Sequence, residues 1–160
     1  MSPVRTSGDD ETERRVLADI ATHGWHCVGI HPEGDEAGYV FTVGLFQTLG
    51  HPELVVFGLP PQIAVGIFGI VVEAARSGRP LDLAQPTDLL LEGYECRFAR
   101  VPVSRYPAFV GLGRWYYQGD DFPLYQLVWP ARDGTFPWHP DASPDFRRAQ
   151  PVIAIPPEGA

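Results

Sequence analysis

The chain has 160 residues and a formal net charge of −8, with a pI near 4.9. This length suits one domain, so we take residues 1–160 as a single unit that buries about two thirds of the surface of its unfolded chain. A mean hydropathy of −0.09 is ordinary for a soluble globular protein, and no apolar run approaches the roughly 18 residues that a membrane span needs. The acidic balance argues against nucleic-acid binding, which depends on clustered positive charge.

The residue types that are missing exclude several chemistries. All 12 basic residues are Arg, and without Lys the chain has no Schiff-base amine and no P-loop lysine. It also has no CxxC, HExxH, GxSxG or GxGxxG motif. Residues 1–15 are charged where a signal peptide is apolar, so a cytoplasmic location is the default. Cys27 and Cys96 are then expected to be buried thiols, with contact between them left open.

The first helix has signals at both ends. Asp10 and Glu13 resemble a capping box with Asp in place of Ser or Thr, and Gly24 supplies a left-handed stop. Apolar residues at helical spacing lie between them. Residues 1–9, before this helix, are expected to be disordered.

Strand-like runs follow at residues 25–30 and 39–45, and the polar turn between them predicts an antiparallel pair. Side chains on a strand alternate between faces, so Thr42 is a lone hydroxyl on an otherwise small, apolar face. A third strand is expected at residues 54–57.

The strongest helical pattern covers residues 61–77, with Pro61 at its start. Val65 and Ile70 extend its apolar surface round most of the circumference, which predicts burial on more than one side. Gly66 and Gly69 would weaken the isolated helix by about 1 kcal/mol each, so tertiary contacts must stabilise it.

The remaining elements are less regular. Residues 81–91 indicate a loop and a short apolar run, residues 94–101 a strand, residues 106–118 a short helix and residues 124–129 the last clear strand. Residues 130–160 are rich in proline and predict a surface arm. Together the elements predict an α+β fold: a curved, largely antiparallel sheet or a partly closed, split-barrel-like barrel, with one buried helix and one or two peripheral helices.

Five segments carry a resemblance to a known family: HGWHCVGI, FTVGL, GHPELVVFGLP, QLVWPARDGTFPW and RRAQPVIAI. On these segments residues 20–155 resemble a family of small bacterial proteins known only as a domain of unknown function, the DUF4262-like group. In that pattern Asp usually follows the Trp-Pro pair, whereas here Ala131 stands there and Asp133 lies two residues on. The resemblance implies no established reaction.

The segment His51-Pro52-Glu53 is the first candidate for chemistry. It places an imidazole and a carboxylate at the start of a buried strand, where His51 would be the general base or a ligand contact and Glu53 would orient it or act as a second acid/base. The alternative is that both side chains satisfy backbone groups of the preceding loop, residues 47–50.

Aromatic residues gather in the last third of the chain, and aromatic walls with a few polar groups commonly line small-molecule pockets. We therefore predict one pocket, with His51 and Trp138 on opposite walls. Core packing is the alternative role for these aromatic residues. The expected ligand contacts are Tyr39, Thr42, Gln126, Trp129, Trp138 and His139.

The preferred function is binding of a small organic molecule or a peptide, and a homodimer is left open. The enzyme alternatives are cofactor-free acid/base chemistry by His51 and Glu53, or flavin-dependent redox chemistry. The order of elements is similar to the split barrels of flavin reductases, which would imply FMN near Thr42 and residues 46–51. No other cofactor is expected.

A metal site is not predicted from the histidine-rich segment HGWHCVGIH. On one strand face Cys27 and His31 would lie about 13 Å apart, at about 3.3 Å per residue, whereas ligands converge within about 2 Å of one ion. A composite site drawn from His31, His51, Glu53 or His139 is left open.

Overall fold

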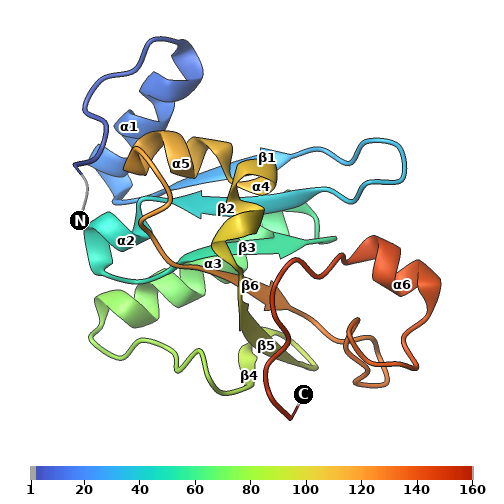
Figure 1. Cartoon of the computed structure of the whole chain (residues 1–160). Coiled ribbons are helices and arrows are strands. Elements are labelled where there is room, and N and C mark those ends of the chain that lie inside the picture. Colours follow the sequence, from blue (N-terminus) through green and yellow to red (C-terminus); the bar gives the residue numbers. More distant parts are fainter. Residues whose placement is uncertain (1–2, 160) are drawn as a thin grey trace.

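The structure is a computed structural model that describes residues 3–159. A mixed six-stranded sheet forms the centre of the molecule (Figure 1). The strands are β1 (His26–Ile30), β2 (Tyr39–Val43), β3 (Glu53–Phe57), β4 (Thr87–Leu91), β5 (Tyr94–Arg100) and β6 (Leu124–Val128). Their order across the sheet is β1-β2-β3-β6-β5-β4. The predicted strands at residues 25–30, 54–57, 94–101 and 124–129 are confirmed to within one residue at either end.

Pairing across the sheet is antiparallel except between β3 and β6, which run parallel. Because β1 and β4 lie at opposite ends of the strand order, the sheet formed by the described residues is open. The α+β class and the curved sheet are therefore confirmed, and the partly closed, split-barrel-like alternative is wrong.

Helices cover both faces of the sheet. They are α1 (Glu11–His23), α2 (Leu45–Leu49), α3 (Pro61–Arg76), α4 (Tyr106–Phe109), α5 (Gly111–Tyr117) and α6 (Pro144–Ala149), with a 3-10 turn at Val103–Arg105. Figure 1 shows α3 on one face and α4 and α5 on the other. Within the part of the chain that the structure describes, no helix is long and apolar enough to span a bilayer.

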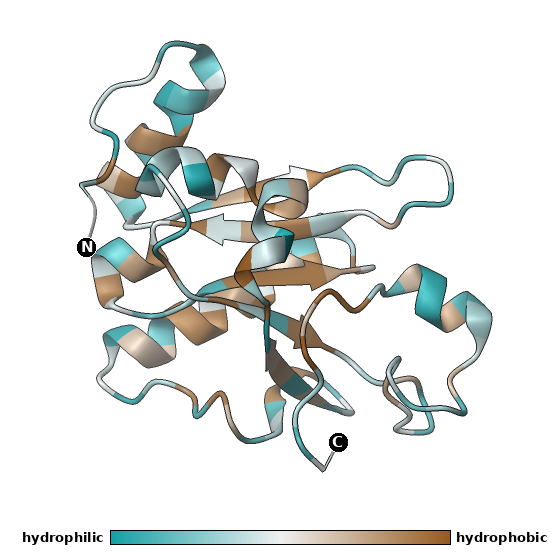
Figure 2. Ribbon diagram, in the orientation of Figure 1, coloured by the Kyte–Doolittle hydropathy of each residue, from teal (hydrophilic) through white to brown (hydrophobic). Residues whose placement is uncertain are grey.

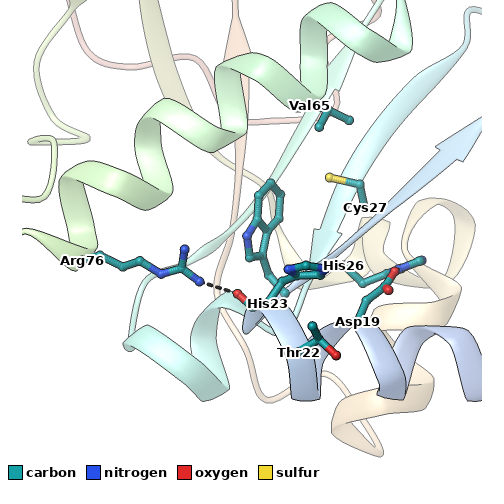
Figure 3. A pocket seen from close by; sticks show the side chains of 8 residues that line it. Asp19, Thr22, His23, His26, Cys27, Val65 and Arg76 are labelled. Carbon is teal, nitrogen blue, oxygen red and sulfur yellow. Dashed lines mark hydrogen bonds and ion pairs between the residues drawn. The ribbon is translucent and has the colours of Figure 1, made fainter.

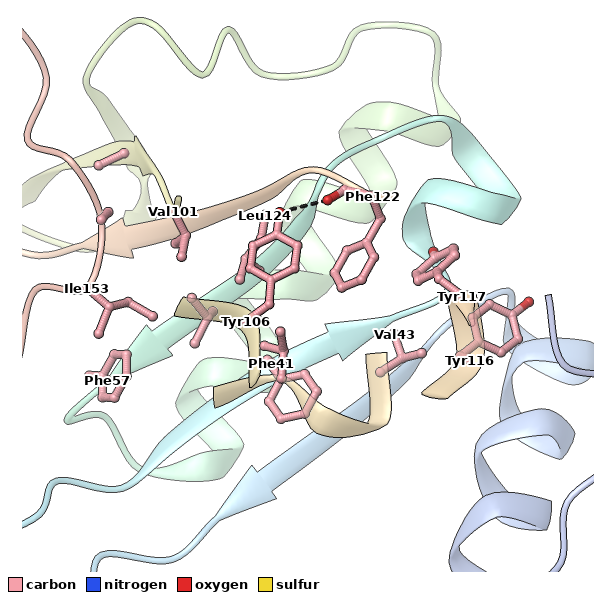
Figure 4. Packing of buried hydrophobic residues seen from close by; sticks show 14 of the residues in the cluster. Phe41, Val43, Phe57, Val101, Tyr106, Tyr116, Tyr117, Phe122, Leu124 and Ile153 are labelled. Atoms are coloured by element: carbon pink, nitrogen blue, oxygen red, sulfur yellow. Dashed lines mark hydrogen bonds between the residues drawn. The ribbon is translucent and has the colours of Figure 1, made fainter. Parts of the chain in front are cut away.

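Two apolar clusters separate on the two sides of the sheet because side chains alternate along each strand. On β3, Leu54 and Val56 face α3, whereas Val55 and Phe57 face α1, α4 and α5. All five residues of β3 are buried, and Figure 2 shows this central strand as largely hydrophobic. Figure 4 shows the second cluster, in which aromatic rings of α4 and α5 pack over β2.

The first helix forms as predicted. The Asp10 carboxylate accepts the Glu13 N–H at 2.7 Å, and the Glu13 carboxylate accepts the N–H of Asp9, the residue before the cap, at 2.8 Å, which resembles a capping box. Gly24 ends the helix with a positive φ of 88°.

The segment before α1, for which disorder over residues 1–9 is predicted, makes contacts with the rest of the fold. Met1 and Ser2 lie outside the described residues. Farther along, Val4 packs against the apolar cluster and the Arg5 N–H donates to the Tyr116 carbonyl at 2.9 Å. A segment of low hydrophobicity is thus held by contacts with α5, which no local pattern indicates.

The helix α3 is less buried than its composition predicts. Ile63, Val65 and Ile70 are 43%, 42% and 43% exposed, so α3 packs on the sheet through one face and presents apolar side chains on the other. The prediction of burial on more than one side is wrong.

Three further boundaries differ from prediction. The run at residues 39–45 leaves the sheet after Val43, because Gly44 (φ 106°) turns the chain into α2. The helix expected at residues 106–118 is interrupted at Val110, whose backbone is not helical. Within the proline-rich arm, α6 was not predicted, although Ser143 caps it by accepting the Phe146 N–H at 3.1 Å.

Two glycines provide a test of the packing. A methyl group on Gly58 (φ 80°) would collide with the carbonyl oxygen of Ala149, whereas one on Gly66 would meet nothing within 4 Å. We expect Gly58→Ala to destabilise the protein by about 2 kcal/mol or more, and Gly66→Ala to stabilise it by about 1 kcal/mol through helix propensity. Urea unfolding measures both, and equal effects would contradict this account of the packing.

Candidate functional site

The carboxylate of Glu53 is the most highly bonded side chain at the predicted site. It is 1% exposed and accepts hydrogen bonds from the Thr42 hydroxyl at 2.7 Å and from the Tyr117 hydroxyl. It also accepts the consecutive N–H groups of residues 44–46 at 3.1, 3.2 and 3.1 Å. Five donors therefore converge on one carboxylate, which joins β2, α2, β3 and α5.

Local structure explains why this carboxylate is needed. The N-terminal N–H groups of a helix have no partners within it, and Gly44 has no side chain with which to cap α2. Glu53 supplies the missing acceptor from the neighbouring strand. Thr42 is fixed at the same time, because its hydroxyl accepts the Leu54 N–H at 2.9 Å while donating to Glu53.

The hydrogen-bond partners, all of which donate to Glu53, give its carboxylate an accepting role. Burial raises the pKa of Glu53, and the hydrogen bonds from Tyr117, Phe46, Thr42 and Leu45 oppose that rise. Burial and the nearby charge of Glu53 raise the pKa of Tyr117, so its hydroxyl keeps its proton and donates it. The cluster holds the fold together, and its polar groups are already paired with one another.

His51 points elsewhere. Its Nδ1 lies 2.8 Å from the carbonyl oxygen of Pro52, which places the ring hydrogen on Nδ1 and leaves Nε2 as the basic nitrogen. Nε2 is buried and has no hydrogen-bond partner among the described residues. Burial lowers the pKa of His51. His51 is not among the partners of Glu53, so the structure does not join the predicted acid/base pair.

Trp138, which was predicted to form the pocket wall opposite His51, stacks on Phe136 with ring centroids 4.9 Å apart. Its neighbour His139 is exposed, and the His139 Nδ1 accepts the Asp141 N–H at 3.1 Å. Neither His51 nor Trp138 lines any of five surface hollows found over residues 3–159. None of these hollows connects the two rings.

Two other predicted ligand contacts fasten the C-terminal arm. The Trp129 indole donates to the Phe57 carbonyl at 2.9 Å. Gln126 is fully buried, donates to the Pro151 carbonyl at 2.8 Å and accepts the N–H groups of Ile153 and Ala154 at 3.0 and 3.2 Å. These contacts bring the end of the arm against the sheet, so that part of the arm is buried.

The residues expected to contact FMN form hydrogen bonds or helical structure within the protein itself. The Thr42 hydroxyl and the Phe46 N–H both bond to Glu53, and residues 45–49 form α2 where a loop was expected.

Cys27 and Cys96 are free thiols. Among the described residues no group of three or more His, Cys, Asp or Glu side chains could hold a metal ion.

Among the predicted contacts, Tyr39 lines one of the five hollows just described. This Tyr39 hollow has a volume of about 680 Å³. Tyr39, Phe57 and Phe109 form its aromatic floor, with centroid distances of 4.8 Å and 5.8 Å from Tyr39 to the other two rings. The Tyr39 hydroxyl donates to the Phe109 carbonyl at 2.9 Å.

Side chains of opposite charge line the Tyr39 hollow. One rim carries Glu33, Asp35 and Glu36 from the β1–β2 loop, and the other carries Arg147 and Arg148 from α6. Burial and the charge of Glu36 raise the pKa of the tyrosine on the floor. The two arginines are adjacent in the sequence, but nothing in it indicated that they would line the same hollow as an acidic loop more than 100 residues away.

The fold and this cluster define an open-sheet α+β protein whose buried carboxylate ties a short helix to the sheet. Residues 19–143 match the family model described as a domain of unknown function (DUF4262), and the chain belongs to that family. The family assignment made from the sequence is thereby confirmed. No curated protein and no solved structure matches the chain.

Substitution of the central carboxylate tests its role in stability. Glu53→Gln places an amide NH₂ among groups that all donate to Glu53, so we expect a loss of about 3 kcal/mol of unfolding free energy. Tyr117→Phe removes one donor and should cost about 1.5 to 2 kcal/mol. Urea unfolding at pH 7 measures both, with the exposed Glu95→Gln as the control. Equal stability of Glu53→Gln and Glu95→Gln would contradict the role given to Glu53.

The pH dependence of stability should report on His51. Because burial lowers its pKa, the unfolded chain binds a proton on this ring more readily than the folded chain does. The stability that the neutral His51 ring contributes is therefore complete above about pH 6.5, the ordinary pKa of histidine. It is lost as the pH falls from there towards the pKa of His51 in the folded protein. We expect His51→Gln to flatten the dependence of the unfolding free energy on pH between about pH 5 and pH 7, as measured by urea titration. The exposed His23→Gln should retain the wild-type slope, and a wild-type slope in His51→Gln would rule the explanation out.

Proposed function

We propose that this protein is a binding domain for a small organic molecule or a short peptide that carries both a positive and a negative group. The observation behind this proposal is the Tyr39 hollow, in which an aromatic floor lies between an acidic and a basic rim. Its volume of about 680 Å³ falls within the range of about 300–1,000 Å³ that is usual for ligand pockets.

The basic rim is held in place by the protein itself. The Arg147 guanidinium donates from Nη2 to the carbonyls of His139 and Pro140 at 2.8 and 3.1 Å, and Arg148 pairs with Asp145. A guanidinium has five N–H donors, so Arg147 can hold these carbonyls and also bind a ligand carboxylate. A held side chain loses less conformational entropy when a ligand binds.

The acidic rim is also constrained. Glu33 and Glu36 exchange backbone hydrogen bonds of 3.0 and 2.8 Å, which close the β1–β2 loop and keep its carboxylates together. An ammonium group would bind at this rim, a carboxylate at Arg147, and an apolar or aromatic portion over Tyr39. Aromatic amino acids and short aromatic peptides have this combination of groups.

The test uses phenylalanine and the dipeptide Phe-Phe as probes in ligand-observed NMR and calorimetry. We expect saturable binding that weakens about tenfold or more in Arg147→Gln and in Glu36→Gln, since one lost charged contact is worth at least 1.4 kcal/mol or so. N-acetyl-phenylalanine, which lacks the cation, should bind more weakly than phenylalanine.

The exposed Arg79→Gln is the matched control for the loss of one positive charge. Thermal unfolding of each variant shows whether α6 stays in place. Absence of saturable binding, or equal binding to Arg147→Gln and Arg79→Gln, would overturn the proposal.

A further inference from the structure

A second hollow, independent of the Tyr39 hollow, lies where α1, β1 and α3 meet. It has a volume of about 490 Å³, and its lining includes Asp19, Thr22, Trp25, His26, Val65 and Arg76. Figure 3 shows these side chains coming from three elements, with Arg76 of α3 reaching across to the carbonyl of His23. We call it the His26 hollow.

The His26 hollow contains a histidine already oriented by a carboxylate. The His26 Nδ1 lies 2.6 Å from Asp19 Oδ2, and the two side chains are 13% and 40% exposed. A carboxylate at Nδ1 selects the tautomer with its hydrogen there and leaves Nε2 as the proton acceptor. This is the arrangement by which a carboxylate positions a general base in hydrolytic sites.

An apolar groove continues from this hollow along α3. A neighbouring hollow of about 500 Å³ shares Trp25 and Arg76 with the first and is lined further by Gly66, Gly69 and Ile70. A methyl group built on either glycine would meet nothing within 4 Å, so the groove floor is open. The groove runs along α3 from Gly66 to Glu73, a distance of about 10 Å at about 1.5 Å per helical residue. A medium-chain acyl group has about this length.

The thiol in the His26 hollow is a poor nucleophile. Burial, together with the charges of Asp19 and Glu53, raises the pKa of Cys27 to about 12, so the sulfur keeps its proton near neutral pH. Water is then the group that an oriented base in this hollow would activate.

We propose that this junction hydrolyses carboxylic esters with a medium-length acyl chain. The chain lies in the groove along Gly66 and Gly69, and the ester group lies where the two hollows meet at Trp25 and Arg76. His26 Nε2 takes a proton from water as the water oxygen bonds to the acyl carbon. The C–O bond to the alcohol then breaks, and His26 returns the proton to the leaving oxygen, which gives one carboxylic acid and one alcohol.

The other residues have separate parts in this scheme. Asp19 is a positioning residue, because it acts through His26. Arg76 is held by the His23 carbonyl at the junction of the hollows, where its positive charge stabilises the negative oxygen of the tetrahedral intermediate.

The experiment compares hydrolysis of p-nitrophenyl octanoate and p-nitrophenyl acetate by the full chain. We expect the octanoate to have the higher kcat/KM, and His26→Ala to lower the rate by about 100-fold or more. Added imidazole should restore part of the rate of His26→Ala, beyond the rate at which imidazole alone hydrolyses the ester, which a purely structural role for His26 would not allow. Asp19→Asn should lower kcat about tenfold or more with KM unchanged, because the acyl groove is intact.

Two matched variants complete the design. Gly69→Leu fills the groove but leaves Asp19 and His26 in place, so it should reduce octanoate hydrolysis and spare acetate hydrolysis. His139→Gln removes an exposed histidine elsewhere and should behave as wild type. The proposal would be overturned if His26→Ala had the wild-type rate, or if imidazole restored none of its activity. It would also be overturned if Gly69→Leu affected both esters equally.

Discussion

The acceptance of five hydrogen bonds by Glu53 is the constraint on which the rest of the structure depends. Removing a carboxylate from water costs several kcal/mol, and only a complete set of donors offsets that cost. Here the donors come from β2, the start of α2 and Tyr117 of α5. Each donor would itself be buried without a partner if Glu53 were absent. The carboxylate and the short helix that it caps are therefore stable only together, and they fix how α2 and α5 sit on the sheet.

Local signals predicted the parts of the fold that local interactions determine. Asp10 caps the start of α1 and Gly24 its end, as expected, and the polar turn joins β1 to β2 in an antiparallel pair. The parallel pairing of β3 with β6 depends on contacts between distant segments, so no local pattern indicates it. The same reason explains why Leu45 was assigned to a strand: its helical conformation depends on an acceptor eight residues later.

Proximity in sequence was misleading at the predicted site. His51 and Glu53 lie two residues apart, yet the imidazole bonds to the Pro52 carbonyl while the carboxylate turns into the fold. The sequence correctly drew attention to Thr42 and Glu53 as unusual polar residues in an apolar region, but an unusual buried residue can be structural as readily as catalytic. The Tyr39 hollow could not be predicted in full, because its two charged rims come from opposite ends of the chain.

Both hollows border β1, and the architecture explains that placement. The central strand β3 is buried along its whole length, and its one charged side chain is occupied in capping α2. Side chains in the middle of the sheet are thus committed to packing and to internal hydrogen bonds. At the edge, β1 has a neighbour on one side only, so its first residue, His26, lines one hollow and its last, Ile30, lines the other. A rigid centre with polar side chains at an open edge is an arrangement in which ligand contacts can vary without disturbing the core.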